Sequence, residues 1–283
     1  QADHAEETQL SKPTVQNRFV SRLVAQMMEQ IHLSKLPLDD TISRRAFEQY
    51  IKSLDPTKMY FMQSDIDEFS SMKTSIDDLM KSGDYSVALT VFKRFMQRVD
   101  QRTDLAVEMI DADHDFSLQE EMITDTDLLT FAKTDEEIRD KWRKRMKYSL
   151  LVMKTDDDDK KKNADEAEAE AEAEGADEAD SGDTEADRPK IKKPTEDPKE
   201  RLRKRYRSFA RRMHQLDTED VVERYITAIT NSFDPHTSYM SKGSFENFLI
   251  QMGLELEGIG ATLQATDDGY TVIKNIVPGG AAA

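Results

Sequence analysis

The chain has 283 residues, of which 34% are charged and 37% hydrophobic, and its mean hydropathy is −0.73. These values are polar for a compact globule, so part of the chain is expected outside any core, above all residues 155–187, which hold 16 Asp or Glu against 3 Lys. The net charge of −17 argues against nucleic-acid binding, no apolar run reaches the roughly 20 residues of a membrane helix, and the absence of cysteine excludes disulfides.

The first 154 residues have the apolar spacing of a helical bundle. Between residues 14 and 35, apolar side chains recur every four positions and predict an amphipathic helix. Its expected buried stripe is Val15, Phe19, Leu23, Met27 and Ile31, widened by Val20, Val24 and Met28. Asp40 or Thr41 can cap a second helix, and Pro56 must end it because a proline ring blocks the helical hydrogen bond.

Further start and stop signals continue this helical domain, predicted over residues 1–154. Ser64 with Asp67 resembles a capping box, and Gly83 should end the helix that follows. Asp84 then begins a longer helix, and Thr134 marks the start of another.

Residues 155–200 offer almost nothing to bury. They contain an Asp run, a Lys run, strict Ala-Glu alternation, and then Gly, Ser and Pro. Such a segment cannot offset the entropy that ordering would cost, so it is predicted to be a disordered acidic linker. Alanine and glutamate are good helix formers, which allows transient helix there but no packed core.

Helical spacing resumes over residues 201–252, which are predicted to complete the helical domain. The basic run at residues 201–212 is interpreted as a solvated helix face beside the acidic linker rather than as a nucleic-acid site. After Met252 the pattern changes to alternation, with a turn at Asp267-Asp268-Gly269. Residues 253–283 are therefore predicted to begin a small sheet domain that is incomplete.

Two segments echo each other, Ser-Leu-Asp-Pro at residues 53–56 and Ser-Phe-Asp-Pro at residues 232–235. Each is interpreted as the end of a helix, with an Asp-Pro turn whose carboxylate accepts hydrogen bonds from free backbone amides. His236 follows the second motif, but no nucleophile or second base accompanies it. The five histidines are too scattered for a metal site, and no phosphate-binding loop is present, so no metal or cofactor is expected.

The segment Gly258, Ile259, Gly260 and Ala261 leads into an alternating strand. Glycines let the backbone turn sharply, so successive N–H groups can point at one spot and hold a terminal carboxylate. A tight turn or bulge without a ligand explains the same residues, and local sequence leaves both interpretations open.

Together these motifs resemble a known family. Ser-Phe-Asp-Pro-His-Thr-Ser-Tyr-Met at residues 232–240, a short helix, Gly-Ile-Gly-Ala at 258–261 and Val-Pro-Gly-Gly-Ala at 277–281 resemble the entry to the PDZ domain of carboxyl-terminal processing peptidases. The motif at residues 53–56, with Tyr60-Phe61 and Ser64-Asp65-Ile66, resembles the helical amino-terminal domain of their long bacterial branch, the tail-specific proteases. The acidic segment is longer and more biased than the family pattern.

The resemblance implies an exported, periplasmic serine endopeptidase with a Ser-Lys dyad, whose PDZ domain captures the carboxyl termini of protein substrates. It implies that Gly258, Ile259, Gly260 and Ala261 bind the carboxylate. The dyad lies beyond the PDZ domain in the family, so this chain is expected to lack it and to be inactive alone. The start at Gln1 fits removal of an export signal, although a trimmed chain would look the same.

Two expectations concern partners. The Met-rich helical domain is expected to receive a protein, which the family suggests is an envelope adaptor that could also associate the chain with the membrane. The alternative function is a non-enzymatic helical adaptor with a PDZ-like peptide-binding module. A serine and a lysine in a strand-helix context further along the gene would decide between the two.

Overall fold

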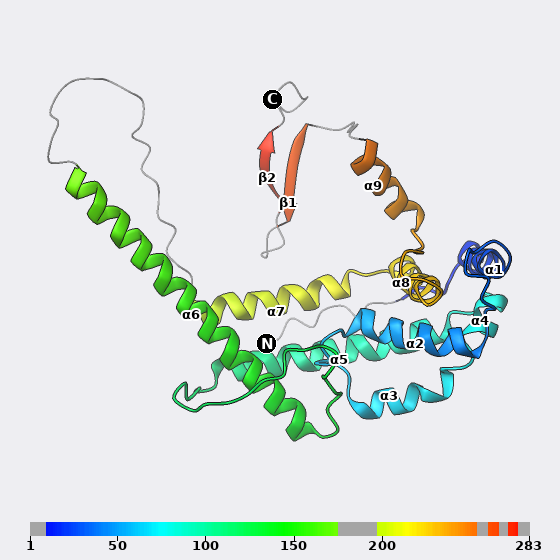
Figure 1. Cartoon of the computed structure of the whole chain (residues 1–283), viewed down its shortest axis with the longest axis horizontal. Coiled ribbons are helices and arrows are strands. Elements are labelled where there is room, and N and C mark those ends of the chain that lie inside the picture. Colours follow the sequence, from blue (N-terminus) through cyan, green and yellow to red (C-terminus); the bar gives the residue numbers. More distant parts are fainter. Residues whose placement is uncertain (1–9, 175–196, 254–259, 266–270, 277–283) are drawn as a thin grey trace.

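The computed structural model describes residues 10–174, 197–253, 260–265 and 271–276, with the backbone alone at residues 156–174, 251 and 265. Within these residues the fold is mainly α with one two-stranded sheet, as the sequence predicts (Figure 1). None of the described helices is both long and apolar enough to cross a membrane.

The helices of the first part are α1 (Val15–Gln30), α2 (Asp40–Leu54), α3 (Gln63–Phe69), the 3-10 helix η1 (Ser70–Met72), α4 (Ile76–Ser82) and α5 (Ser86–Asp111). The later elements are α6 (Asp135–Glu174), α7 (Pro198–His214), α8 (Thr218–Asn231), α9 (Lys242–Gly253), β1 (Ala261–Ala265) and β2 (Thr271–Ile276). In Figure 1, α6 projects away from the bundle, and α9 leads from it to the sheet.

Two predicted helix starts are displaced by one or two residues. Asp39, not Asp40 or Thr41, caps α2, because its carboxylate accepts the N–H groups of Thr41 at 2.8 Å and Ile42 at 3.1 Å. The capping box predicted at Ser64 and Asp67 is wrong. Helix α3 starts at Gln63, and the Asp65 carboxylate accepts the N–H of Met62 at 2.9 Å.

Helix α1 forms where the spacing predicts it, but the prediction of its buried face is right only in part. Met28 is buried, and Val20 and Val24 pack half-buried against the core, whereas the main stripe does not. The apolar stripe is exposed, with Phe19 at 61%, whereas Ala25 is only 2% exposed. The buried face consists of Asn17, Ser21, Ala25 and Met28.

The small residues of α1 face α4, because the two helices approach closely. Ser21 donates a hydrogen bond to the Met80 carbonyl at 2.8 Å. The single helix predicted from Ser64 to Gly83 is broken into α3, η1 and α4. Gly83 ends the last of these with φ 78°, and an added Cβ would lie 2.7 Å from the Arg18 carbonyl oxygen. A bulky stripe could not fit at this distance.

Helices α7 and α8, from beyond the acidic segment, pack onto helices from before it. Helix α8 lies against α2, where the rings of Tyr50 and Tyr225 meet edge to face with centroids 5.3 Å apart. Helix α7 lies against α5 and α6, and Leu202 joins a second apolar cluster around Trp142. The core of the bundle therefore combines residues from both parts of the chain.

The predicted linker, residues 155–200, overlaps helical residues at both ends. Helix α6 continues to Glu174, and α7 already starts at Pro198. The high helix propensity of alanine and glutamate explains the extension of α6, and proline suits a first helical turn. Residues 175–196 lie outside the described residues.

Candidate functional site

The predicted carboxylate-binding segment is only partly described. Gly258 and Ile259 lie outside the described residues. Gly260 has φ 72°, in the left-handed region that favours glycine, and Ala261 is the first residue of β1. The backbone therefore turns sharply at Gly260, directly before the strand, which both sequence-based interpretations require.

Strand β1 pairs with β2 in an antiparallel hairpin, with an irregular register between Thr262 and Leu263. The large apolar side chains of the hairpin are uncovered: Leu263 of β1 is 51% exposed and Ile273 of β2 is 60% exposed. Within the described residues, neither strand has a second neighbour in a sheet. A hairpin in this state can accept a further strand by main-chain hydrogen bonding.

The first Asp-Pro turn is closed by the buried carboxylate of Asp55. Its Oδ1 accepts the N–H of Met59 at 2.9 Å, and its Oδ2 accepts those of Tyr60 at 2.9 Å and Phe61 at 3.0 Å. Burial raises the pKa of Asp55, and these three donors oppose the rise. The interpretation of this motif as a turn closed by its own carboxylate is confirmed, and the turn fixes Tyr60.

The second turn uses Asp234 in the same way and adds a histidine that lies just after α1. Asp234 accepts the N–H of His236 at 2.8 Å and the hydroxyl of Thr237, and His32 Nε2 lies 2.8 Å from its Oδ2. The Thr237 hydroxyl, the His236 N–H and His32 lower the pKa of Asp234 to about 2. The histidine in contact with this carboxylate is thus His32, which no sequence pattern singles out.

His32 also contacts Ser34, whose Oγ lies 2.8 Å from Nδ1, so serine, histidine and aspartate form a hydrogen-bonded chain. The N–H of Ser34 also points at this nitrogen, at 3.2 Å, which makes it an acceptor. Neither His32 nor Ser34 lines any of the three main cavities in the described chain. This group ties the residues after α1 to the turn after α8.

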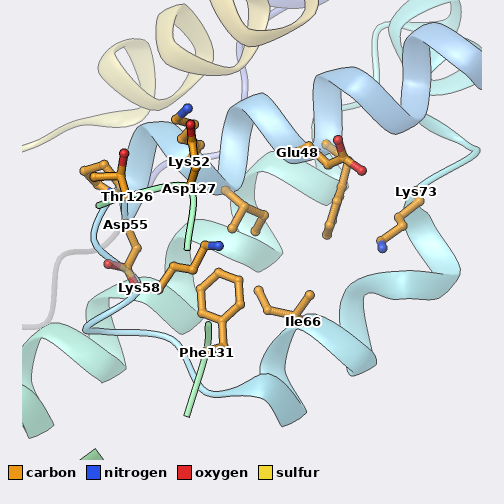
Figure 2. Close-up of a pocket in the computed structure, with 12 residues that line it drawn as sticks. Glu48, Lys52, Asp55, Lys58, Ile66, Lys73, Thr126, Asp127 and Phe131 are labelled. Carbon is orange, nitrogen blue, oxygen red and sulfur yellow. The ribbon is translucent and has the colours of Figure 1, made fainter. Parts of the chain in front are cut away.

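A cavity of about 280 Å³ lies between α2, the first Asp-Pro turn and residues 126–131 (Figure 2). Its floor is apolar, and the ammonium groups of Lys58 and Lys73 lie over the rings of Phe131 and Phe47, at 5.6 and 5.4 Å from their centroids. Lys58 also donates to the carbonyl of Leu129. Glu48 and Asp127 stand on the same rim, so the charge is mixed (Figure 2).

This cavity can take up a small group. In the described part of the chain, no three His, Asp or Glu side chains lie close enough together to hold a metal ion.

Comparison with known proteins identifies the helical region. Residues 24–243 match the family described as the tail-specific protease N-terminal domain. The chain is also similar to a tail-specific protease of Haemophilus influenzae, with 29% identity over 268 residues, which are 94% of this chain and 33% of that protein. The chain spans about a third of the length of this relative. It belongs to the tail-specific protease family.

Proposed function

We propose that this chain is the non-catalytic amino-terminal part of a tail-specific serine endopeptidase, which captures substrate carboxyl termini through a PDZ domain and degrades or processes proteins of the cell envelope. The observation that carries the proposal is the order of the elements. A region that matches the tail-specific protease N-terminal domain is followed by a left-handed glycine and an antiparallel hairpin.

The left-handed turn at Gly260 supports a role for residues 258–261 in binding a carboxylate. Such a turn can direct successive backbone N–H groups at one point, and each charge-assisted hydrogen bond to a carboxylate contributes about 1.5–3 kcal/mol. Backbone donors provide this binding, so the identity of the side chains matters mainly through backbone shape.

The test is a titration of the completed PDZ domain, joined to this chain, with a peptide that has an apolar carboxyl terminus. Gly260→Val should weaken binding, because valine disfavours φ 72° and crowds the ligand. Gly243→Val is the matched control, because an added Cβ at Gly243 meets no atom within 4 Å. The assignment fails if the amidated peptide binds as tightly as the acid, or if Gly260→Val leaves affinity unchanged.

The chain alone is expected to show no peptidase activity on unfolded proteins or tail peptides. The one hydrogen-bonded group of serine, histidine and aspartate described above, at Ser34, His32 and Asp234, lies away from the three main cavities. Turnover together with labelling by a serine-reactive fluorophosphonate would contradict this expectation.

The exposed stripe of α1 supports docking of an adaptor protein of the envelope on the helical domain. It places Phe19, Leu23 and Met27 on one uncovered face, which is unusual for a surface without a partner. A photoreactive residue at position 19 should crosslink to the adaptor in envelope extracts, whereas one at exposed Arg44 should not. Equal crosslinking from both positions would remove this support.

A further inference from the structure

A second cleft, of about 270 Å³, lies between α6, α7 and the residues that follow the first Asp-Pro turn. The residues that line it combine aromatic rings with guanidinium groups: Thr57, Met59, Tyr60, Trp142, Arg145, Arg205, Tyr206, Phe209 and Arg212. We call it the Arg-aromatic cleft. None of these residues is acidic, which distinguishes it from the mixed rim of the cavity in Figure 2.

The aromatic wall of the Arg-aromatic cleft is held in place from several sides. Tyr60 stacks on Phe209 with ring centroids 5.4 Å apart, and Trp142 meets Tyr206 edge to face at 5.3 Å. The Trp142 indole N–H donates to the Met59 carbonyl at 3.0 Å. Because the buried Asp55 turn fixes the backbone of Met59 and Tyr60, the wall exists without a ligand.

The charge of the cleft comes from helices on two sides. Arg205 and Arg212 stand with Phe209 on one face of α7, at positions i, i+4 and i+7, and Arg145 comes from α6. Arg205 and Arg212 form no ion pair with any described residue. Burial raises the pKa of Tyr206, and the charges of Arg145 and Arg205 oppose that rise, so both charges reach the aromatic wall.

We propose that the Arg-aromatic cleft binds a carboxylate carried beside an aromatic or large apolar side chain of a polypeptide. The proposal rests on the proposed function for the class of ligand, since a tail-specific protease handles polypeptide chains. Planar guanidinium groups match a carboxylate through paired hydrogen bonds, and the rings offer an apolar surface next to it. The volume suits one or two side chains rather than a folded partner.

The carboxylate could be the α-carboxylate of a chain terminus or the side chain of Asp or Glu within a chain. Three short peptides without tryptophan separate these sources. The first has Glu beside Phe and an amidated terminus, the second has Gln beside Phe and a free carboxyl terminus directly after the Phe, and the third has Gln and an amidated terminus. Trp142 is the only tryptophan of the chain and lines the cleft, so its emission reports binding without a label.

We expect the first or the second peptide, or both, to shift the emission of Trp142 in the full chain, and the third to leave it unchanged. An equal response to the third peptide would overturn the proposal, because no carboxylate would then be needed. Inorganic phosphate that gave the same shift at equal concentration and ionic strength would also overturn it, in favour of a general oxyanion site.

The variants compare two pairs of arginines on the same helix. Arg205→Gln with Arg212→Gln should weaken peptide binding about tenfold or more. Arg207→Gln with Arg211→Gln removes the same charge from exposed positions outside the cleft and should change affinity far less. An equal loss of peptide affinity in the two double variants would show that the net positive charge of α7 attracts the peptide without a specific site, and would overturn the proposal. Circular dichroism of both pairs checks that the helices remain.

The emission of Trp142 also separates this proposal from the PDZ assignment. Gly260→Val should leave the Trp142 titration unchanged, because Gly260 does not line the Arg-aromatic cleft. Gly260→Val therefore tests the PDZ assignment, and Arg205→Gln with Arg212→Gln tests the cleft, so one can fail while the other holds. A loss of the Trp142 signal in Gly260→Val would contradict a separate site.

Discussion

The carboxylates of Asp55 and Asp234 each accept backbone N–H groups directly after a helix, yet their surroundings differ. Asp55 is only 1% exposed and gains three backbone donors. Asp234 lies at the surface and adds the Thr237 hydroxyl and His32. Burial dominates at the first site and hydrogen bonding at the second, so their pKa values move in opposite directions.

The two turns should therefore give opposite pH dependences of stability. The folded pKa of Asp234 is about 2, below its unfolded value, so its stabilising contribution is present above about pH 4 and is lost as pH falls toward 2. The folded pKa of Asp55 is raised, so its contribution instead grows as pH falls through that pKa.

Urea unfolding of the chain, Asp55→Asn and Asp234→Asn at several pH values between about 7 and 3 measures both effects. On acidification, the destabilisation caused by Asp234→Asn should shrink, and that caused by Asp55→Asn should grow. Slopes of the same sign for the two variants would show that burial does not dominate at Asp55.

At the scale of single elements, α1 shows what hydrophobic spacing can and cannot predict. The spacing placed the helix correctly, because any amphipathic sequence with this period favours helix. It placed the main stripe on the wrong face, because the close approach of α4 at Gly83 admits Ser21 and Ala25 but not a bulky stripe. Of the predicted side chains, only Met28 is fully buried. The strongest apolar stripe of a helix need not be the one that meets the core.

Substitutions on the two faces of α1 should differ accordingly. Phe19→Ser, on the exposed stripe, should change the free energy of unfolding by no more than about 0.5 kcal/mol. Ser21→Leu, on the buried face, should destabilise by about 1–3 kcal/mol, because it overpacks the contact with α4 and removes the hydrogen bond to the Met80 carbonyl. Chemical denaturation measures both, and a larger loss from Phe19→Ser would reverse the assignment of the faces.

Only the α7 side of the Arg-aromatic cleft could be predicted from the sequence. The charge of residues 201–212 favours a solvated helix face, although Arg205, Phe209 and Arg212 share a helical spacing that marks a mixed face. The other wall comes from Tyr60 and Trp142. No local pattern predicts which distant segments a helix will meet, so the cleft required the structure.

At the scale of the whole molecule, the bundle depends on helices from both sides of the acidic segment. Arg224 donates to the carbonyl of Ser53 at 3.0 Å, across 171 residues of chain. Helices α7 and α8 also bury Leu202, Tyr225 and Ile226 among residues of the first part. We therefore expect the two parts to stay together without a covalent connection through residues 175–196.

A cut in that connection should leave the bundle together. A protease site inserted between residues 180 and 181, once cleaved, should give two fragments that co-elute in size-exclusion chromatography, because their shared core is apolar and buried. The control is the cleaved chain with Tyr225→Ala and Ile226→Asp, which should separate. Separation of the cleaved chain without these substitutions would contradict the shared core.

Because α2 packs against α8, part of the core cannot form until α8 has been synthesised. At 5–20 residues per second, the ribosome needs roughly 9–34 s to travel the 171 residues between Ser53 and Arg224. During that interval the surface of α2 that later meets α8, including Tyr50, has no native cover. A nascent chain of this kind offers a holding chaperone an apolar target until α8 emerges.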